Sequence, residues 1–184
     1  PSGAAFNYFD PDSLDKVPKT LSATGFYDNI ATKQVTARAV LFEVNSPLWS
    51  DAAGKKRWVL LKPGRTIGYK DTSDYYTYPD STIFIKEFSH DTVPGDTTSR
   101  ILWETRLLVL KKDTATKLDK WHGFSYRWNA QGADARLVSL FDGERAVLRY
   151  YPNGLTQPAQ LRKWFFPSQG GCNGCHVNSV TEVQ

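Results

Sequence analysis

Short apolar segments alternate along the chain with breaks that are rich in glycine and proline. β-Branched and aromatic residues concentrate in eight segments, which are residues 35–44, 57–61, 66–69, 81–88, 101–110, 121–128, 135–140 and 146–151. The breaks include Pro63-Gly64, Pro79-Asp80 and Asn153-Gly154, and such dipeptides are typical of turns. Short strands at this spacing predict a mostly β fold, an antiparallel sandwich or barrel-like sheet with at most one or two short helices.

Helical periodicity is weak, and residues 158–164 are the best candidate for a single short helix. Asp142-Gly143 predicts a tight hairpin turn, because glycine readily takes the positive φ that such turns require. Residues 1–25 are rich in Pro, Asp, Ser and Gly and show little periodicity. We therefore expect an N-terminal arm packed on the domain (1–25), followed by a single β-rich domain (26–184).

The composition of the chain limits the classes of function that it can have. The 184 residues are 40% hydrophobic and 14% aromatic, enough to build a core. A net charge of +4 is too small to predict a nucleic-acid partner. No apolar run approaches the roughly 18 residues that a membrane-spanning helix needs. The sequence starts at Pro1 without a methionine and its start is not signal-like, which predicts a processed or trimmed chain.

The two cysteines lie in one short motif, Cys172-Asn173-Gly174-Cys175-His176. This is the C-x-x-C-H attachment signature of a c-type haem. In that chemistry each thiol adds to one vinyl group of the porphyrin, and the histidine that follows supplies an axial nitrogen ligand. We therefore expect one covalently attached haem c, its iron bound by His176 on the proximal side.

Other uses of a cysteine pair fit less well. A disulfide between Cys172 and Cys175 leaves His176 unexplained. Zinc needs further ligands, and the sequence has no second cysteine pair. A thioredoxin-like redox pair needs a βαβ context, which the strand pattern does not provide.

The sequence leaves several candidates for the second axial ligand of the iron. The chain contains no methionine, so it cannot supply a methionine ligand itself. In residues 121–128, alternation places His122 on one face with Phe124, Tyr126 and Trp128, and His122 is the candidate distal ligand. His90 precedes a turn-rich segment and is expected to be solvated. His90, a lysine, water or an empty position remain as alternatives.

Charged residues inside the predicted strands point to internal sites. Lys86 and Glu87 lie among apolar neighbours on both faces of their strand, so one of them is expected to line a cavity or form a buried pair. Glu104 and Arg106 share a face and predict a structural ion pair. Residues 55–57, a basic run, form a solvated strand start or meet an anionic group. Trp49 is expected in a packed turn, with ligand stacking as the alternative.

Three segments resemble a known family. They are Tyr78-Pro79-Asp80-Ser81-Thr82-Ile83-Phe84-Ile85-Lys86-Glu87, the strand pair that contains Leu107-Leu108-Val109-Leu110 and Trp121-His122-Gly123-Phe124, and the terminal C-x-x-C-H. They are similar to the small β-sheet c-type cytochromes, cytochrome c′-beta and its hydroxylamine-oxidising relatives. In the latter a lysine is cross-linked to the haem, and the resemblance implies that Lys86 takes this position. Segments around Trp49 and Trp164 also resemble β-rich haem-linked domains of uncharacterised bacterial secreted cytochromes.

These features favour a mono-haem cytochrome that transfers electrons with a redox partner protein or with other haem subunits. Haem c is attached outside the cytoplasm in bacteria, so a periplasmic or extracellular location is expected. An electron-transfer role is favoured over an enzymatic one, because no catalytic set can be identified. A five-coordinate haem that binds nitric oxide or oxidises hydroxylamine is the first alternative. An interaction module of a larger cytochrome assembly is the second, and the oligomeric state stays open.

Overall fold

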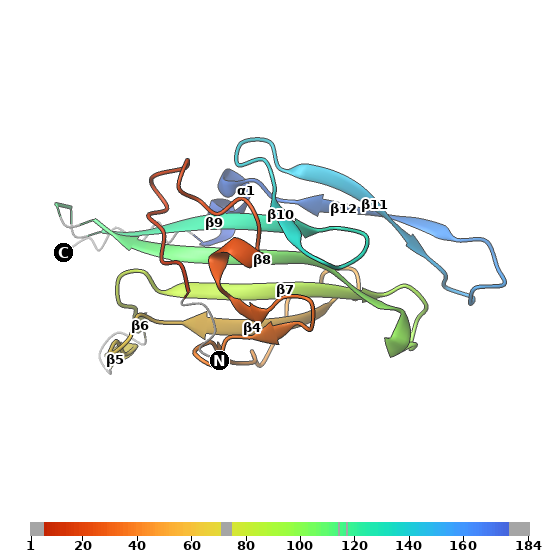
Figure 1. The fold of residues 1–184 in the computed structure, drawn as a ribbon, viewed down its shortest axis with the longest axis horizontal. Coiled ribbons are helices and arrows are strands. Elements are labelled where there is room, and N and C mark those ends of the chain that lie inside the picture. Colours follow the sequence, from red (N-terminus) through yellow and green to blue (C-terminus); the bar gives the residue numbers. More distant parts are fainter. Residues whose placement is uncertain (1–5, 71–74, 114, 117, 177–184) are drawn as a thin grey trace.

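A six-stranded antiparallel sheet forms the centre of the molecule (Figure 1). The computed structural model describes residues 6–70, 75–113, 115–116 and 118–176. Residues 1–5 of the expected arm and 177–184 of the expected domain lie outside the described residues. The strand order is β10-β9-β8-β7-β4-β3. These strands are β3 (Val40–Leu41), β4 (Gly54–Leu60), β7 (Ile83–Asp91), β8 (Arg100–Lys112), β9 (Asp119–Trp128) and β10 (Ala135–Leu137).

Smaller elements surround this sheet. Three two-stranded antiparallel sheets pair β1 (Tyr27–Asn29) with β2 (Gln34–Val35), β5 (Gly68–Lys70) with β6 (Tyr75–Thr77), and β11 (Glu144–Tyr150) with β12 (Gln160–Phe166). The helices are two 3₁₀ turns, η1 (Ser22–Thr24) and η2 (Thr97–Ser99), and α1 (Gln169–His176). The predicted mostly β, antiparallel fold is confirmed. Within the described residues no helix has the length and apolarity needed to cross a membrane.

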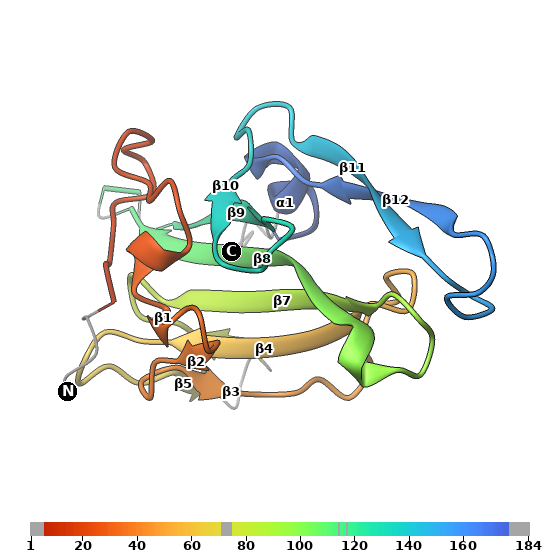
Figure 2. The same cartoon turned by 45° about the vertical axis from the view of Figure 1, so that its right-hand side comes forward.

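One face of the central sheet is covered by the N-terminal segment (Figure 2). This face carries Ile83, Ile85, Leu107, Val109 and Phe124, all buried. The side chains that cover it come from residues 6–27 and include Phe6, Phe9, Val17, Leu21 and Phe26. The segment is held further by backbone bonds to β10, from Leu21 N–H to Ala135 O (2.8 Å) and from Leu137 N–H to Lys19 O (2.8 Å). The N-terminal segment therefore supplies six of the sixteen buried residues of the main core.

The opposite face is covered by the β11–β12 hairpin and by α1 (Figure 2). Phe88 of β7 packs there against Trp164 and Phe166 of β12. The prediction of a helix at residues 158–164 is wrong, because this segment pairs along its length with β11. Its alternate residues Trp164 and Phe166 are buried while Phe165 is exposed, which is the two-residue period of a strand. The helix follows instead, at Gln169–His176.

Several local predictions are corrected. Residues 35–44 contain only the last residue of β2 and the two-residue strand β3, because a turn at residues 36–39 separates them. Gly143 has the expected positive φ of 68°, but no hairpin forms there, since β10 pairs with β9 and β11 with β12. Trp49 is 74% exposed rather than packed, because residues 45–51 of the β3–β4 connection contribute no side chain to either core cluster.

Candidate functional site

The helix that carries the two cysteines follows directly after β12. Ser168 precedes α1, and its hydroxyl accepts a hydrogen bond from the Gly171 N–H (3.2 Å), as an N-cap residue does. The backbone N–H of Gln169 donates to Leu140 O (3.0 Å). Three of the eight helical residues are glycine, so the intrinsic helix propensity is low. The helix is therefore held mainly by its contacts with the sheet.

Gly123 of β9 is the point where α1 meets the sheet. A Cβ atom at Gly123 would lie 2.1 Å from the Cβ of Cys172, so only glycine fits beneath this cysteine. Cys172 is buried there beside Ser125, and its burial raises the pKa of its thiol. Cys175 and His176, one turn further along, are exposed and lie at the edge of a groove. Both thiols are free.

The groove lies between α1 and the central sheet and has a volume of about 420 Å³. Apolar side chains form most of its wall, and aromatic rings are in mutual contact there. The ring centroids of Phe84 and Trp121 lie 5.8 Å apart, and Tyr78 packs edge-on against both. The groove is lined by Phe42, Val44, Arg57, Phe84, Ile85, Lys86, Arg106, Leu108, Trp121, Cys175 and His176.

Three cationic side chains cross the groove in one row. Arg57, Lys86 and Arg106 are directly paired across β4, β7 and β8. The Arg106 guanidinium and the Lys86 ammonium also lie over the ring of Phe88, at 4.6 and 4.9 Å from its centroid. Desolvation, followed by the charges of Arg57 and Arg106, lowers the pKa of Lys86 to about 8. Such a row of like charges favours an anionic ligand.

Glu104 fixes the position of Arg106. Its carboxylate is fully buried and accepts two hydrogen bonds from the Arg106 guanidinium, at 2.7 and 2.9 Å. Trp164 Nε1 donates a third, at 2.9 Å. The predicted ion pair is confirmed, and it is bidentate. It points the guanidinium of Arg106 along the groove at the same time as it neutralises the buried carboxylate.

His176 shares the groove with these cations. Its desolvation at the sheet surface, and then the charges of Lys86 and Arg106, lower the pKa of its imidazole. A neutral imidazole has a free nitrogen lone pair, which is the form that binds metal ions. Among the described residues no group of three or more His, Cys, Asp or Glu side chains could hold a bare metal ion. A metal here would need most of its ligands from a bound group.

The structure brings Lys86, Cys172, Cys175 and His176 together but not His122. Alternation puts His122 on the opposite face of β9, since its neighbour Gly123 faces α1. Its Nε2 lies 3.4 Å from Asp12 Oδ1, and its Nδ1 lies 3.4 Å from Gln169 Nε2. The aromatic residues that share its face form the core beneath the N-terminal segment. His122 therefore does not fit as a ligand to a group held in the groove.

His90 is buried, which corrects the prediction of a solvated side chain. It packs edge-on against Trp164 at 5.0 Å, and its Nδ1 lies 3.3 Å from the Arg162 guanidinium. Burial is the main cause that lowers the pKa of His90 to about 4. The β11–β12 hairpin covers this end of β7, and no local sequence pattern around His90 indicates that cover. His90 does not line the groove.

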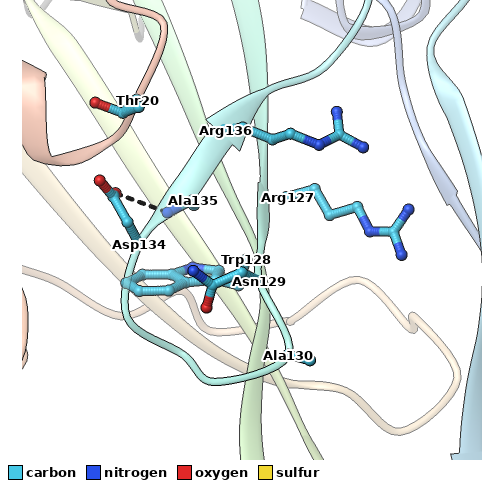
Figure 3. A pocket seen from close by; sticks show the side chains of 8 residues that line it. All are labelled: Thr20, Arg127, Trp128, Asn129, Ala130, Asp134, Ala135 and Arg136. Carbon is cyan, nitrogen blue, oxygen red and sulfur yellow. Dashed lines mark hydrogen bonds between the residues drawn. The ribbon is translucent and has the colours of Figure 1, made fainter.

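A second hollow, of about 500 Å³, lies at the turn between β9 and β10 (Figure 3). Arg127 and Arg136 extend from it to the same side, and both form ion pairs with Glu144. Asp134 accepts hydrogen bonds from Ser22 and from the Ala135 N–H. The charged side chains that line this hollow thus hold the N-terminal segment and the β11–β12 hairpin to the sheet. Arg127, Asp134 and Arg136 are all engaged in these contacts.

Sequence reasoning missed the residues that complete the groove. The sequence indicates Arg57 only as part of a basic run and Arg106 only as an ion-pair partner. It indicates Trp121 and Gly123 only as strand residues, and no pattern places these four residues at one site. A glycine inside a strand often marks a close backbone approach, and that signal could have identified Gly123.

Comparison with protein-family models, curated proteins and solved structures finds no match to this chain.

Proposed function

We propose that this chain is a c-type cytochrome domain that carries one haem c and transfers electrons outside the cytoplasm. The observation that carries the proposal is the groove: Cys175 and His176 stand at the edge of an aromatic wall that is crossed by a row of three cations. A haem combines a flat apolar ring with two carboxylates. The lining therefore fits this group in both its apolar and its charged parts.

Each residue has a defined task in this proposal. Cys172 and Cys175 would form the two thioether links, and His176 would supply a nitrogen ligand to the iron. Phe84 and Trp121 would contact the ring and exclude water from it. Arg57, Lys86 and Arg106 offer cations to the propionates. When bound, the haem supplies an iron centre that gains and loses one electron.

The proposal is tested by producing the chain in bacteria that export it and attach haem c. We expect an intact mass increased by one haem and a c-type pyridine haemochrome spectrum. Replacing both cysteines, Cys172→Ser and Cys175→Ser, should abolish the covalent link. A colourless native protein with the mass of the bare chain would refute the proposal.

The cationic row makes a further prediction about the reduction potential. A positive charge beside a haem favours the reduced state, so Arg57→Gln should lower the potential of the haem. Lys56→Gln is the matched control, because Lys56 is the exposed neighbour of Arg57 on the other face of β4. It should change the potential much less. Equal shifts in both variants, measured by spectroelectrochemical titration, would contradict the proposed propionate contact.

A second candidate function is favoured by the positions of the other histidines. His90 and His122 both lie away from the groove, and the sequence has no methionine. Lys86 is therefore the candidate nitrogen ligand besides His176 in the described lining. A five-coordinate haem that binds nitric oxide or oxidises hydroxylamine is the corresponding proposal. A high-spin spectrum that changes on addition of nitric oxide would favour it, whereas a six-coordinate low-spin spectrum would favour electron transfer.

A further inference from the structure

The positive charge of the chain is concentrated in the β11–β12 hairpin. Residues 144–166 contain four cations, Arg145, Arg149, Arg162 and Lys163, and one acid, Glu144, which is paired with Arg127 and Arg136 of the sheet. Their formal charge is +3 out of +4 for the whole chain. The hairpin projects beyond the central sheet (Figure 1). Its cations therefore attract an approaching anionic molecule.

The outer face of the hairpin alternates cations with apolar side chains. Each cross-strand pair on this face joins one of each kind, as Arg145↔Phe165, Val147↔Lys163 and Arg149↔Leu161. All six side chains are exposed, and the apolar ones are strongly so: Val147 by 51%, Leu161 by 68% and Phe165 by 48%. A hollow of about 390 Å³ lies among Arg145, Ala146, Val147 and Lys163.

These apolar residues belong to neither core cluster. The inward-facing residues Leu148, Trp164 and Phe166 are buried and hold the hairpin on the sheet. On the outward face the Arg145 guanidinium lies 5.7 Å from the centroid of the Phe165 ring, and exposed apolar side chains grouped with cations are typical of a contact surface. The interleaving also argues against a lipid surface, because membrane-binding segments separate an apolar face from a basic one. A protein surface can match alternating charges and apolar groups one by one.

We infer that the outer face of the β11–β12 hairpin docks an acidic protein partner whose carboxylates alternate with apolar side chains. The inference rests on the hairpin alone and holds whether or not the groove carries haem. It specifies the surface of the redox partner that electron transfer would need, which is acidic and interleaved with apolar side chains. β12 ends at Phe166 and α1 begins at Gln169, so a partner bound here lies beside the element that carries both cysteines.

The test uses a labelled peptide of about 14 residues that alternates glutamate with valine and leucine, and fluorescence anisotropy reports its binding. A second peptide replaces the apolar residues by serine at the same charge. We expect the first peptide to bind the chain at least about tenfold more tightly than the second, and its affinity to fall as salt rises. The double variant Arg145→Glu, Lys163→Glu should weaken binding by about tenfold or more.

Two controls separate this surface from general charge. The variant Lys16→Glu, Lys56→Glu changes the net charge equally at exposed positions outside the hairpin, and it should retain affinity within about twofold. Phe165→Ser should weaken binding of the apolar peptide but not of the serine peptide. Equal losses in both charge variants, no binding of either peptide, or binding only to vesicles of three parts phosphatidylcholine and one part phosphatidylglycerol would overturn the inference.

Discussion

Glu87 is a carboxyl group inside the main core. It shares a face of β7 with Ile83 and Ile85, and it is 6% exposed. The Tyr27 hydroxyl donates a hydrogen bond to Glu87 Oε1. Burial raises the pKa of Glu87 to about 7 from its ordinary value of 4.5. The charged form is therefore unfavourable in the fold, and the carboxyl makes stability depend on pH.

The sign of this dependence follows from the two pKa values. Below pH 4.5 the carboxyl is protonated in both the folded and the unfolded chain. As pH rises from about 4.5 to 7, the unfolded chain loses its proton first, so the free energy of unfolding falls, by up to about 3 kcal/mol in total. Glu87→Gln keeps a partner for Tyr27 and removes this loss. The variant should be more stable than the parent at pH 8 and close to it at pH 4.5.

Urea unfolding at the two pH values measures the effect. Glu43→Gln is the control, because Glu43 is an exposed carboxyl and its replacement should leave the difference between pH 4.5 and pH 8 unchanged. If Glu87→Gln shows the same loss of stability with rising pH as the parent, the buried carboxyl does not titrate as expected.

At the scale of elements, α1 depends on one residue of β9. The helix has little propensity of its own, and Cys172 rests directly on Gly123. Gly123→Ala would place a methyl group 2.1 Å from the Cys172 Cβ, so the helix or the strand must move. Overpacking of this kind costs about 1–3 kcal/mol, and we expect a fall of this size in the free energy of unfolding.

Gly174→Ala is the matched control for this prediction. A Cβ at Gly174 meets no atom within 4 Å, and alanine favours helix more than glycine does. Thermal or urea unfolding should therefore show Gly174→Ala as neutral or slightly stabilising. Equal destabilisation by both variants would mean that the contact beneath Cys172 is not what holds α1.

The elements differ in how far sequence reveals them. β7, β8 and β9 are long and alternate clearly, so residues 81–88, 101–110 and 121–128 predicted them well. The sequence of β12 does not alternate clearly, because Leu161 and Phe165 are apolar on the exposed face and Arg162 is charged on the face toward the sheet. The cysteine motif is local and is visible in the sequence. The groove beneath it is assembled from four strands and a helix, and no local pattern shows that Arg57, Arg106 and Trp121 meet there.

At the scale of the whole molecule, the two faces of the central sheet contact different parts of the chain. One face joins the N-terminal segment in the main core, and the other receives the hairpin and α1 around the groove. Residues on neighbouring positions of β7, such as Lys86 and Glu87, therefore belong to different environments. Arg57 and Lys86 line the groove, where Arg106 is held by its ion pair with the buried Glu104.

This division predicts that the N-terminal segment is essential for stability. Phe9 is buried and packs edge-on against Phe124 of β9, with ring centroids 5.5 Å apart. Phe9→Ala should lower the free energy of unfolding by about 3–5 kcal/mol, as removal of a buried phenylalanine does. Phe141→Ala is the control, since Phe141 is 81% exposed and its loss should stay within about 0.5 kcal/mol. Urea unfolding of both variants measures the two losses of stability. If the N-terminal segment only lies on the core, Phe9→Ala should lower the free energy of unfolding as little as Phe141→Ala does.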